Sequence, residues 1–249
     1  MNWEGCDMLI VQKYGGTSLA GMSRLRAAAR RVTGLARQGN QVVVVVSAQG
    51  DTTAILLEKA ETLTACPSLR EKDQLLSAGE QISAALLAME LCRRGIPAQS
   101  LTGWQAGIHT TGTFGDADIT HIDPEMILSL WNRGIVPVVA GFQGIEDGGS
   151  VTTLGRGGSD TTAAALAAAL NADLCRIYTD VDGVYEEDPR LHANAARFTS
   201  IGYEQMLALA ENVAQVLHPK CVRIAMEHGI PLEVCSTFTD TAGTRVGFL

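Results

Sequence analysis

The fold is decided by one glycine-rich stretch, Thr152-Thr153-Leu154-Gly155-Arg156-Gly157-Gly158-Ser159-Asp160-Thr161-Thr162. The alanine-rich run that follows it, residues 163–170, predicts a helix, because Ala and Leu are strong helix formers, and Ser159 is a suitable N-cap. A helix start has unpaired N–H groups and the positive end of the helix dipole, so it attracts anions. A plain glycine-rich turn is the alternative, but Arg156 and Asp160 inside the loop favour an anion site.

Strands and helices alternate on both sides of this stretch. Residues 42–46 are an unbroken valine run, which suits a strand buried on both faces of a parallel sheet. The expected strands are residues 9–14, 42–46, 96–101, 107–111, 135–140, 151–153, 174–179, 231–235 and 244–248. The expected helices are residues 22–37, 55–64, 71–92, 123–132, 163–170, 203–217 and 218–228. This alternation predicts an α/β fold, a three-layer αβα sandwich with a mostly parallel central sheet.

Length and composition exclude several classes of protein. The 249 residues are 46% apolar, enough to bury a sizeable core, and the net charge of −8 argues against a general nucleic-acid or membrane-surface binder. No window approaches the ~20 apolar residues of a membrane span, and the first residues lack the features of a secretory signal. The six cysteines have no C-x-x-C spacing, which favours a reduced, cytoplasmic location.

Two more small, polar turns follow predicted strands. Gly15-Gly16-Thr17-Ser18 breaks the first strand, and residues 47–53 follow the valine run. In open α/β sheets, ligands bind at this carboxyl edge of the strands. The G-x-x-x-x-G-K-[ST] spacing of a P-loop and the G-x-G-x-x-G fingerprint are both absent, so a nucleotide site here would be of another kind. The arginines of the first helix, Arg24, Arg30, Arg31 and Arg37, are expected on its solvated face.

These motifs together resemble the aspartate kinases of the amino-acid kinase family. Lys13-Tyr14-Gly15-Gly16-Thr17-Ser18 is similar to their K-F-G-G-T-S opening, with Tyr14 in place of Phe. The rest follow in the family's order: the loop at 47–53, Gly79-Glu80, Gly141-Phe142, residues 155–160, residues 178–185 with Asp188-Pro189-Arg190, and Leu217-His218-Pro219-Lys220. The resemblance covers the chain from about residue 9 onward.

The resemblance also sets an expectation for domain organisation. It implies one catalytic domain over residues 1–249, with an amino-acid-binding lobe at about 1–150 and a nucleotide-binding lobe at about 151–249. Typical members continue into two ACT domains that bind lysine or threonine, whereas nothing follows Leu249 here. Feedback control by its own chain is therefore not expected. A naturally short enzyme, regulation by a separate chain and a trimmed form of a longer protein all stay open.

The activity that the resemblance implies is phosphorylation of L-aspartate by ATP with Mg²⁺, giving 4-phospho-L-aspartate, the first step of the aspartate pathway to lysine, threonine and methionine. A carboxylate is already ionised at neutral pH, so this reaction needs no general base. Catalysis would rest on positioning and on neutralising charge at the transferred phosphoryl group. The expected partners are ATP and L-aspartate, and a homodimer is expected. A relative that acts on another small carboxylic acid and a catalytically silent binding protein are the alternatives.

The resemblance assigns roles to individual residues. Lys13 is expected to stabilise charge, and Asp160 to organise Lys13 and the Mg²⁺ region, with no direct metal ligand predicted. Arg156 has the planar fork that binds a carboxylate, and Glu80 is expected either to meet the substrate ammonium or to hold Arg156. Phe142 either walls the pocket or belongs to the core. The other substrate-binding residues are Ser47, Thr53 and Ser159, and the nucleotide-binding residues are Lys13, Gly15, Gly16, Ser18, Thr179, Asp180, Tyr185, Arg190 and Lys220. Asp182 is expected to fix its own loop.

Overall fold

The computed structural model describes residues 8–187, 192, 194–212 and 216–248. Its helices are α1 (Gly16–Leu19), α2 (Gly21–Arg37), α3 (Thr52–Leu63), α4 (Leu69–Arg93), α5 (Glu125–Trp131), α6 (Gly158–Ala169), α7 (Tyr203–Asn212) and α8 (Pro219–His228). Its strands are β1 (Leu9–Tyr14), β2 (Gln41–Val46), β3 (Ala98–Leu101), β4 (Ile108–Thr110), β5 (Ile119–Ile122), β6 (Val136–Ala140), β7 (Gln143–Ile145), β8 (Val151–Thr153), β9 (Leu174–Thr179), β10 (Ser200–Gly202), β11 (Leu232–Ser236) and β12 (Thr244–Gly247).

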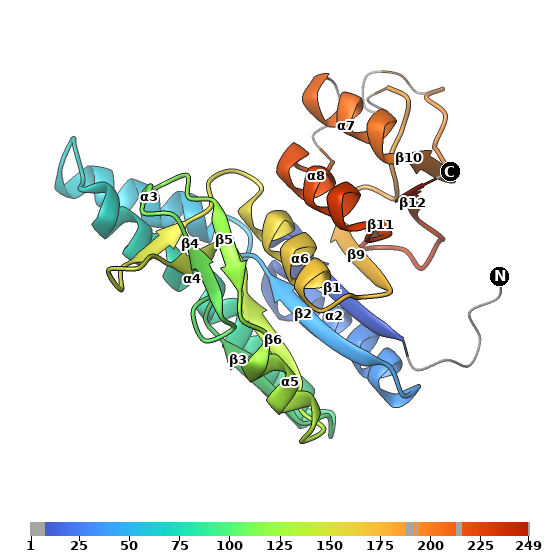
Figure 1. Ribbon diagram of the computed structural model, residues 1–249, viewed down its shortest axis with the longest axis horizontal. Coiled ribbons are helices and arrows are strands. Elements are labelled where there is room, and N and C mark those ends of the chain that lie inside the picture. Colours follow the sequence, from blue (N-terminus) through green and yellow to red (C-terminus); the bar gives the residue numbers. More distant parts are fainter. Residues whose placement is uncertain (1–7, 188–191, 193, 213–215, 249) are drawn as a thin grey trace.

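An eight-stranded sheet forms the centre of the molecule, in the order β10-β12-β11-β9-β1-β2-β6-β3 (Figure 1). Every neighbouring pair is parallel except β11 and β12. Helices cover both faces of this sheet, so the predicted three-layer, mostly parallel α/β fold is confirmed. The first strand, β1, lies between β2 and β9, which places its carboxyl end near the middle of the edge where ligands bind in such sheets.

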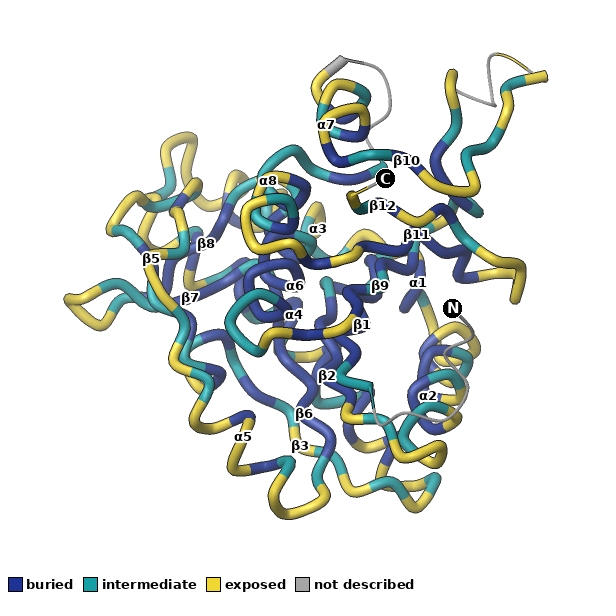
Figure 2. Tube along the Cα trace, turned by 45° about the vertical axis from the view of Figure 1, so that its right-hand side comes forward, coloured by how far each residue is buried: buried dark blue, intermediate teal, exposed yellow. Residues whose placement is uncertain are grey.

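The valine run of β2 shows why the sheet is buried on both sides. Val43 and Val45 pack in the apolar cluster that contains α5, α6, α7 and α8. Val42, Val44 and Val46 pack on the other face with α2 and α4. Successive side chains of a strand point to opposite faces, so a continuous apolar run is what two covering layers require. Figure 2 shows the central strands dark blue along their length, with the exposed residues on the outer sides of the helices.

A second, four-stranded sheet, β5-β4-β7-β8, was not predicted as a separate unit. It lies beside the main sheet, where β8 packs against α4 (Figure 1). Two of its strands, β5 and β7, and the edge strand β10 were missed by the sequence prediction. Each has only three or four residues, and β7 and β10 contain glycine, so the alternating pattern that identifies a strand is too short to detect. The predicted hairpin turn at residues 146–149 does join β7 to β8.

Helix starts and ends correct two predictions. Ser159 is not the N-cap of α6: the helix begins at Gly158, and the cap is Gly157 in a left-handed conformation with φ of 69°. A side chain at Gly157 would clash, because its Cβ would lie 2.3 Å from the Cβ of His218. The helix predicted at 203–217 is α7, which ends at Asn212; Val216 and Leu217 are not helical.

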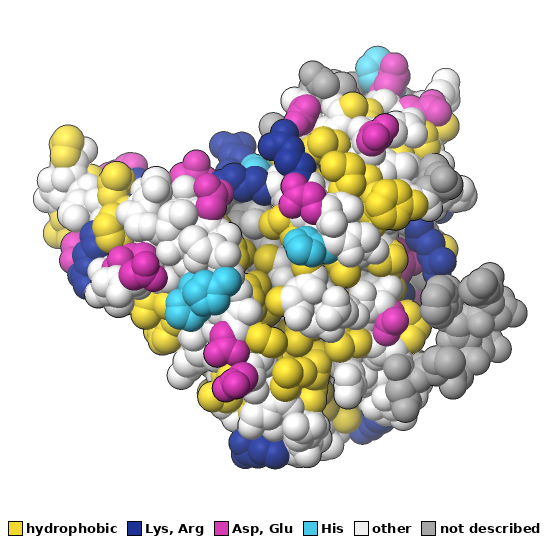
Figure 3. Space-filling view, in the orientation of Figure 1, with side chains coloured by type: hydrophobic (Ala, Val, Ile, Leu, Met, Phe, Trp, Pro, Cys, Tyr) yellow, Lys and Arg dark blue, Asp and Glu magenta, His cyan; other side chains and the backbone are white. Residues whose placement is uncertain are grey.

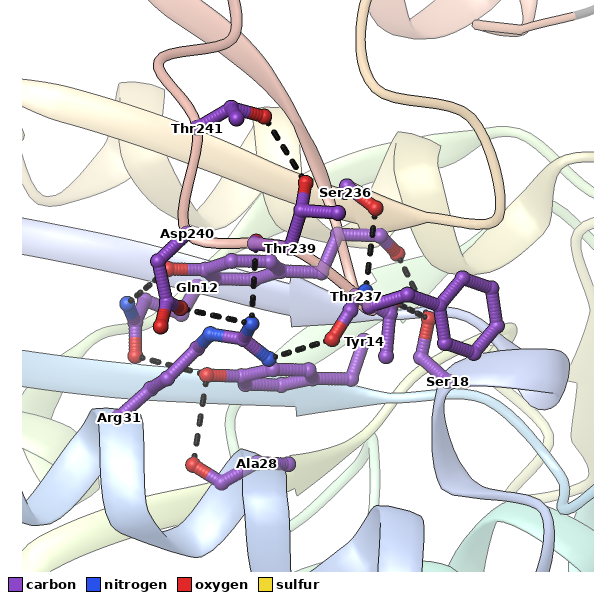
Figure 4. A network of polar contacts seen from close by, with 12 residues as sticks. Gln12, Tyr14, Ser18, Ala28, Arg31, Ser236, Thr237, Thr239, Asp240 and Thr241 are labelled. Atoms are coloured by element: carbon purple, nitrogen blue, oxygen red, sulfur yellow. Dashed lines mark hydrogen bonds and ion pairs between the residues drawn. The ribbon is translucent and has the colours of Figure 1, made fainter.

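Arg31 also departs from the prediction of a solvated arginine face on α2. Its guanidinium donates to the carbonyls of Thr237 and Thr239 and pairs with Asp240 (Figure 4). It also lies over the ring of Tyr178. Tyr178 in turn stacks on Tyr14 with ring centroids 4.7 Å apart. The arginine therefore ties α2 to the chain that follows β11, which no periodicity within α2 could reveal.

By length and composition, α4 is the one helix among the described residues that could cross a membrane. It packs against β3, β6 and β8, and its buried side chains include Leu76, Leu87 and Leu91. More than half of its most apolar segment is buried inside the protein. These contacts are those of a core helix.

Candidate functional site

A cavity of about 290 Å³ opens at the carboxyl edge of the main sheet. Its wall comes from the ends of β1, β2 and β6, from α4, and from the glycine-rich stretch that leads into α6. The residues predicted for a site that line it are Lys13, Gly16, Ser47, Thr53, Glu80, Phe142, Arg156, Ser159 and Asp160. Segments more than a hundred residues apart in the sequence thus meet at one place.

Lys13 and Asp160 form an ion pair in this cavity, with Lys13 Nζ 2.6 Å from Asp160 Oδ1. Lys13 is the penultimate residue of β1, and Asp160 lies in the first turn of α6. Their side chains are only 10% and 14% exposed, so little solvent screens either charge. The pair holds a cation at the start of a helix, where the N–H groups and the dipole already favour an anion.

The two glycine turns at the ends of β1 and β2 touch each other. The Gly50 amide donates to the Gly16 carbonyl at 3.0 Å, and the Gly15 amide donates to the Tyr178 carbonyl at 3.2 Å. A Cβ on Gly16 would lie 2.7 Å from the carbonyl oxygen of Ala48, so a larger residue would push the turns apart. Close backbone packing at the cavity mouth therefore depends on glycine at position 16.

Ser18 does not line the cavity. Its hydroxyl is buried, donates to the Tyr178 carbonyl at 3.1 Å and shares a 2.5 Å hydrogen bond with the Thr237 hydroxyl (Figure 4). Ser18 thus fastens α1 to β9 and to the segment after β11. Gly15, also outside the cavity lining, contacts β9 in the same way through its amide.

Glu80 is a buried acid on α4, not the solvent-facing residue that a lone helical Glu usually is. One carboxylate oxygen accepts from the Ala48 amide at 3.0 Å, and the other is buried with no hydrogen-bond partner among the described residues. Burial raises the pKa of Glu80 to about 7, opposed by its backbone hydrogen bonds. An unpaired acceptor on the wall of a polar cavity suits a cationic ligand group.

Arg156 is exposed at the mouth of the cavity and has no hydrogen-bond or ion-pair partner in the part of the chain that the structure describes. Glu80 therefore does not hold Arg156 in this structure; it holds the backbone of the loop after β2 instead. Phe142, whose two roles were left open, lines the cavity with a positive φ of 70°. Ser159 is buried beside it in the first turn of α6.

Four other residues predicted to bind nucleotide lie outside the cavity lining, at the end of β9, in the loop after it and at the start of α8: Thr179, Asp180, Tyr185 and Lys220. Thr179 donates to Asp180 at 3.1 Å, and the Tyr185 hydroxyl donates to Asp182 at 2.7 Å. Asp182 also accepts from Arg197, so it fixes its own loop as expected. Arg190 lies outside the described residues.

Lys220 has partners that the sequence did not suggest. Its ammonium lies 3.2 Å from Asp116 and 2.9 Å from Asp118, in the loop between β4 and β5, and these carboxylates raise the pKa of Lys220. The Lys220 amide donates to the ring nitrogen of His218, an acceptor role that needs the neutral imidazole. Burial lowers the pKa of His218 and favours that form. In Figure 3, Lys and Arg side chains gather beside Asp and Glu in the notch between the four-stranded sheet and α7–α8.

No group of three or more His, Cys, Asp or Glu side chains in the described ranges is arranged to hold a metal ion. A divalent cation would therefore depend on oxygens that a ligand brings. Asp160 supplies carboxylate oxygens to the cavity next to Lys13. This arrangement suits Mg²⁺, which is often held by phosphates and water with one or two carboxylates.

Comparisons with known proteins show the family of this chain. Residues 8–236 match the profile of the amino acid kinase family. The aspartokinase of Mycobacterium tuberculosis H37Rv is 51% identical over 239 residues, covering 96% of this chain and 57% of that protein. The aspartokinase of Bacillus sp. MGA3 is 52% identical over 238 residues, covering 96% of this chain and 58% of the relative. The chain spans a little over half the length of the curated relatives it matches.

Solved structures show the same likeness. The aspartate kinase from Synechocystis superposes with a TM-score of 0.86 at 47% identity, over 97% of this chain and 40% of that one. E. coli aspartokinase III in complex with aspartate and ADP, in its R-state, superposes with a TM-score of 0.87 at 29% identity, over 96% of this chain and 64% of that one.

Proposed function

Because the chain belongs to the amino acid kinase family, we propose that it transfers the γ-phosphoryl group of ATP to the β-carboxylate of L-aspartate. The observation behind this proposal is the set of charges around one cavity: the Lys13–Asp160 pair, the buried acid Glu80, and Arg156, which has no partner among the described residues. L-aspartate has two carboxylates and one ammonium group, and these residues are complementary to them. The aspartokinase names of its relatives support the same substrate.

Each residue has a physical role in this proposal. The β-carboxylate attacks without a general base, because it is ionised at neutral pH. Lys13 neutralises charge on the transferred phosphoryl group, and Asp160 fixes the ammonium of Lys13 through their 2.6 Å contact. Arg156 binds the α-carboxylate with two parallel hydrogen bonds, and Glu80 accepts from the α-ammonium. Ser47, Thr53 and Ser159 are hydroxyl donors in the same pocket.

ATP is proposed to lie across Gly15 and Gly16, Thr179, Asp180, Tyr185, Arg190 and Lys220, with Mg²⁺ held by its phosphates near Asp160. When bound, the metal ion would offset the negative charge of the phosphates. In this arrangement residues up to about 150 form the amino-acid lobe, and the residues after it form the nucleotide lobe. The product would enter the aspartate pathway, and we place the enzyme in the cytoplasm as a homodimer.

A hydroxylamine trap tests the substrate directly. The chain is incubated with Mg-ATP and one acid at a time, acyl phosphate is captured as hydroxamate, and ADP release is followed in parallel. We expect hydroxamate with L-aspartate and little with succinate, which lacks the ammonium group that Glu80 would bind. Hydroxamate with a different acid would change the substrate, and no hydroxamate with any acid would overturn the proposed activity.

A further inference from the structure

A fully buried carboxylate, Asp73, lies near the start of α4, outside the cavity lining. Its Oδ2 accepts from the amides of Gly115 at 2.9 Å and Thr153 at 2.8 Å, and its Oδ1 accepts from the Thr153 hydroxyl at 2.8 Å. Within the described ranges it has no ion-pair partner. Burying such a group is costly unless fixed donors replace water, so the segments that supply these donors are held firmly.

Both segments held by Asp73 support the glycine-rich loop. Thr153 is the last residue of β8, directly before residues 154–157. Gly115 lies on the other side: a Cβ on Gly155 would be 2.6 Å from Asp116 Oδ1 and 3.3 Å from the Gly115 carbonyl oxygen. The Ala117 amide closes the arrangement by donating to the Thr153 carbonyl at 2.9 Å. One carboxylate therefore fixes the strand that enters the loop and the segment on which the loop packs.

Arg156 depends on this support, because its own side chain has no hydrogen-bond or ion-pair partner in the described part of the chain. Its two neighbours, Gly155 and Gly157, both have positive φ values near 70° and add no side-chain packing. No hydrogen bond or ion pair among the described residues fixes the guanidinium, so its position follows that of the loop backbone. A small rotation at Thr153 would move the fork out of alignment with a carboxylate.

We propose that Asp73 is a positioning residue for Arg156, which sets the affinity for the substrate carboxylate through the backbone of the glycine-rich loop. This inference rests on the proposed function for the identity of the substrate. A carboxylate offers acceptor lone pairs on both oxygens, so Asp73 can serve all three donors at once. An amide keeps one acceptor oxygen, so at best it serves the two backbone amides while its NH₂ group faces the Thr153 hydroxyl, which must then accept instead of donate.

The variant Asp73→Asn tests this arrangement. We expect the KM for L-aspartate to rise about tenfold or more, as for a lost hydrogen bond to a buried charge, with the KM for Mg-ATP within about twofold of the wild type. Thr153→Val removes only the hydroxyl donor and should change the aspartate KM in the same direction by a smaller factor. Thr153→Val also tests the proposal if Asp73→Asn fails to fold. Equal changes in both KM values would overturn the proposal.

Thr152→Val is the matched control. Thr152 is the neighbouring buried residue of β8, and its hydroxyl shares a 2.5 Å hydrogen bond with Thr110, away from Asp73. The Thr152→Val variant loses a buried hydroxyl from the same strand and keeps all the contacts of Asp73. We expect its aspartate KM to stay close to that of the wild type. If the aspartate KM of Thr152→Val rises as much as that of Thr153→Val, any weakening of β8 raises the aspartate KM, and the proposal fails.

A double-mutant cycle with Arg156→Ala separates positioning from a general structural role. If Asp73 acts through Arg156, the effect of Asp73→Asn on the aspartate KM should largely disappear once Arg156 is absent. If the two effects simply add, Asp73 does not act through Arg156 and the inference is wrong.

Hydrogen exchange keeps this test independent of the substrate assignment. Amides of residues 154–157 should exchange faster in Asp73→Asn than in the wild type or Thr152→Val, while those of residues 47–50 stay unchanged. Unaltered exchange at 154–157 would overturn the positioning role. An absence of hydroxamate from the wild-type chain with aspartate would instead overturn the proposed function, whatever the exchange result.

Discussion

The cavity around Lys13 and the ion-pair group around Lys220, which we propose as the amino-acid side and the nucleotide side of the site, are built differently. On the amino-acid side, Lys13, Asp160 and Glu80 are almost fully buried, and backbone amides or opposite charges fix them. On the nucleotide side, Lys220 meets Asp116 and Asp118, whose side chains are 72% and 68% exposed. Buried charges interact strongly and move little, whereas exposed ion pairs are weak and easily exchanged. In the proposed function, the first side is pre-organised for phosphoryl transfer, and the second can give up its internal contacts to a ligand.

Replacing Lys13 should show the largest difference between the two sides. Lys13→Ala removes the buried cation at the end of β1. We expect kcat to fall by about a thousandfold or more, because charge stabilisation in a solvent-poor site is a large part of such catalysis. Steady-state ADP release with saturating aspartate and ATP measures it. Near-normal turnover would remove Lys13 from the catalytic role.

Asp160→Asn controls for the unpaired charge that Lys13→Ala leaves behind. An isolated buried carboxylate is destabilising, so the alanine variant could lose activity through unfolding alone. The amide keeps the size of the side chain and the ammonium of Lys13. We expect Asp160→Asn to lose less kcat than Lys13→Ala, and thermal unfolding of both variants to show that each is folded.

Replacing Arg156 tests aspartate binding on the same side, and we expect a smaller loss of activity than for Lys13. Arg156→Lys keeps the charge but loses the planar fork that binds a carboxylate with two hydrogen bonds. We expect the aspartate KM to rise by about ten- to a hundredfold, with a smaller change in kcat and in the KM for ATP. Initial rates at varied aspartate test this, and an unchanged aspartate KM would place Arg156 outside the substrate site.

The buried acid Glu80 predicts a pH dependence on the amino-acid side. With a pKa of about 7, it is ionised above that pH and protonated below it. Only the ionised form attracts the substrate ammonium, so kcat/KM for aspartate should fall as the pH is lowered from about 8 to about 6. Glu80→Gln should give a low kcat/KM with no step in this range. A step of the same size in the Gln variant would assign the titration to another group.

The same shift has an opposite consequence for stability. The folded pKa of Glu80 lies above its ordinary value of 4.5, so the folded protein binds the proton more tightly than the unfolded chain. The contribution of Glu80 protonation to the free energy of unfolding is fully present below pH 4.5 and is lost as the pH rises through about 7. Compared with the wild type, Glu80→Gln should therefore gain relative stability above pH 7 in thermal unfolding.

The two sides also differed in how far the sequence could predict them. The amino-acid side is formed by glycine turns at the ends of β1 and β2 and by the stretch before α6, and each has a local pattern. A buried valine run identifies its strand, and a polar turn after it marks the edge where ligands bind. The family resemblance then assigned Lys13, Glu80 and Asp160 to this edge, and the three do line one cavity.

The contacts that the sequence missed are those between distant segments. Lys220 meets acids more than a hundred residues earlier, on a loop between two strands of which one, β5, was too short to detect. Asp73 has a helical pattern around it that says nothing of its three donors. Ser159 was wrongly predicted as the N-cap, because the cap is Gly157 and the helix begins at Gly158. The close approach of His218 requires glycine at position 157, and this contact is not visible in the local sequence. Local propensity does not contain such tertiary contacts.

The smallest expected effect belongs to the exposed ion pairs of the nucleotide side. If Lys220 binds phosphate, Asp116 and Asp118 compete with ATP for its ammonium. Asp118→Asn should then lower the KM for ATP by about two- to fivefold at low salt, and salt should abolish the difference, because exposed pairs are weak and screened. Asp123→Asn is the matched control: it removes the same charge beside β5, but its carboxylate accepts from the Glu125 amide and not from Lys220. A rise in the KM for ATP in Asp118→Asn alone would show instead that the acids hold Lys220 in its working position, and the nucleotide side would then be pre-organised like the amino-acid side.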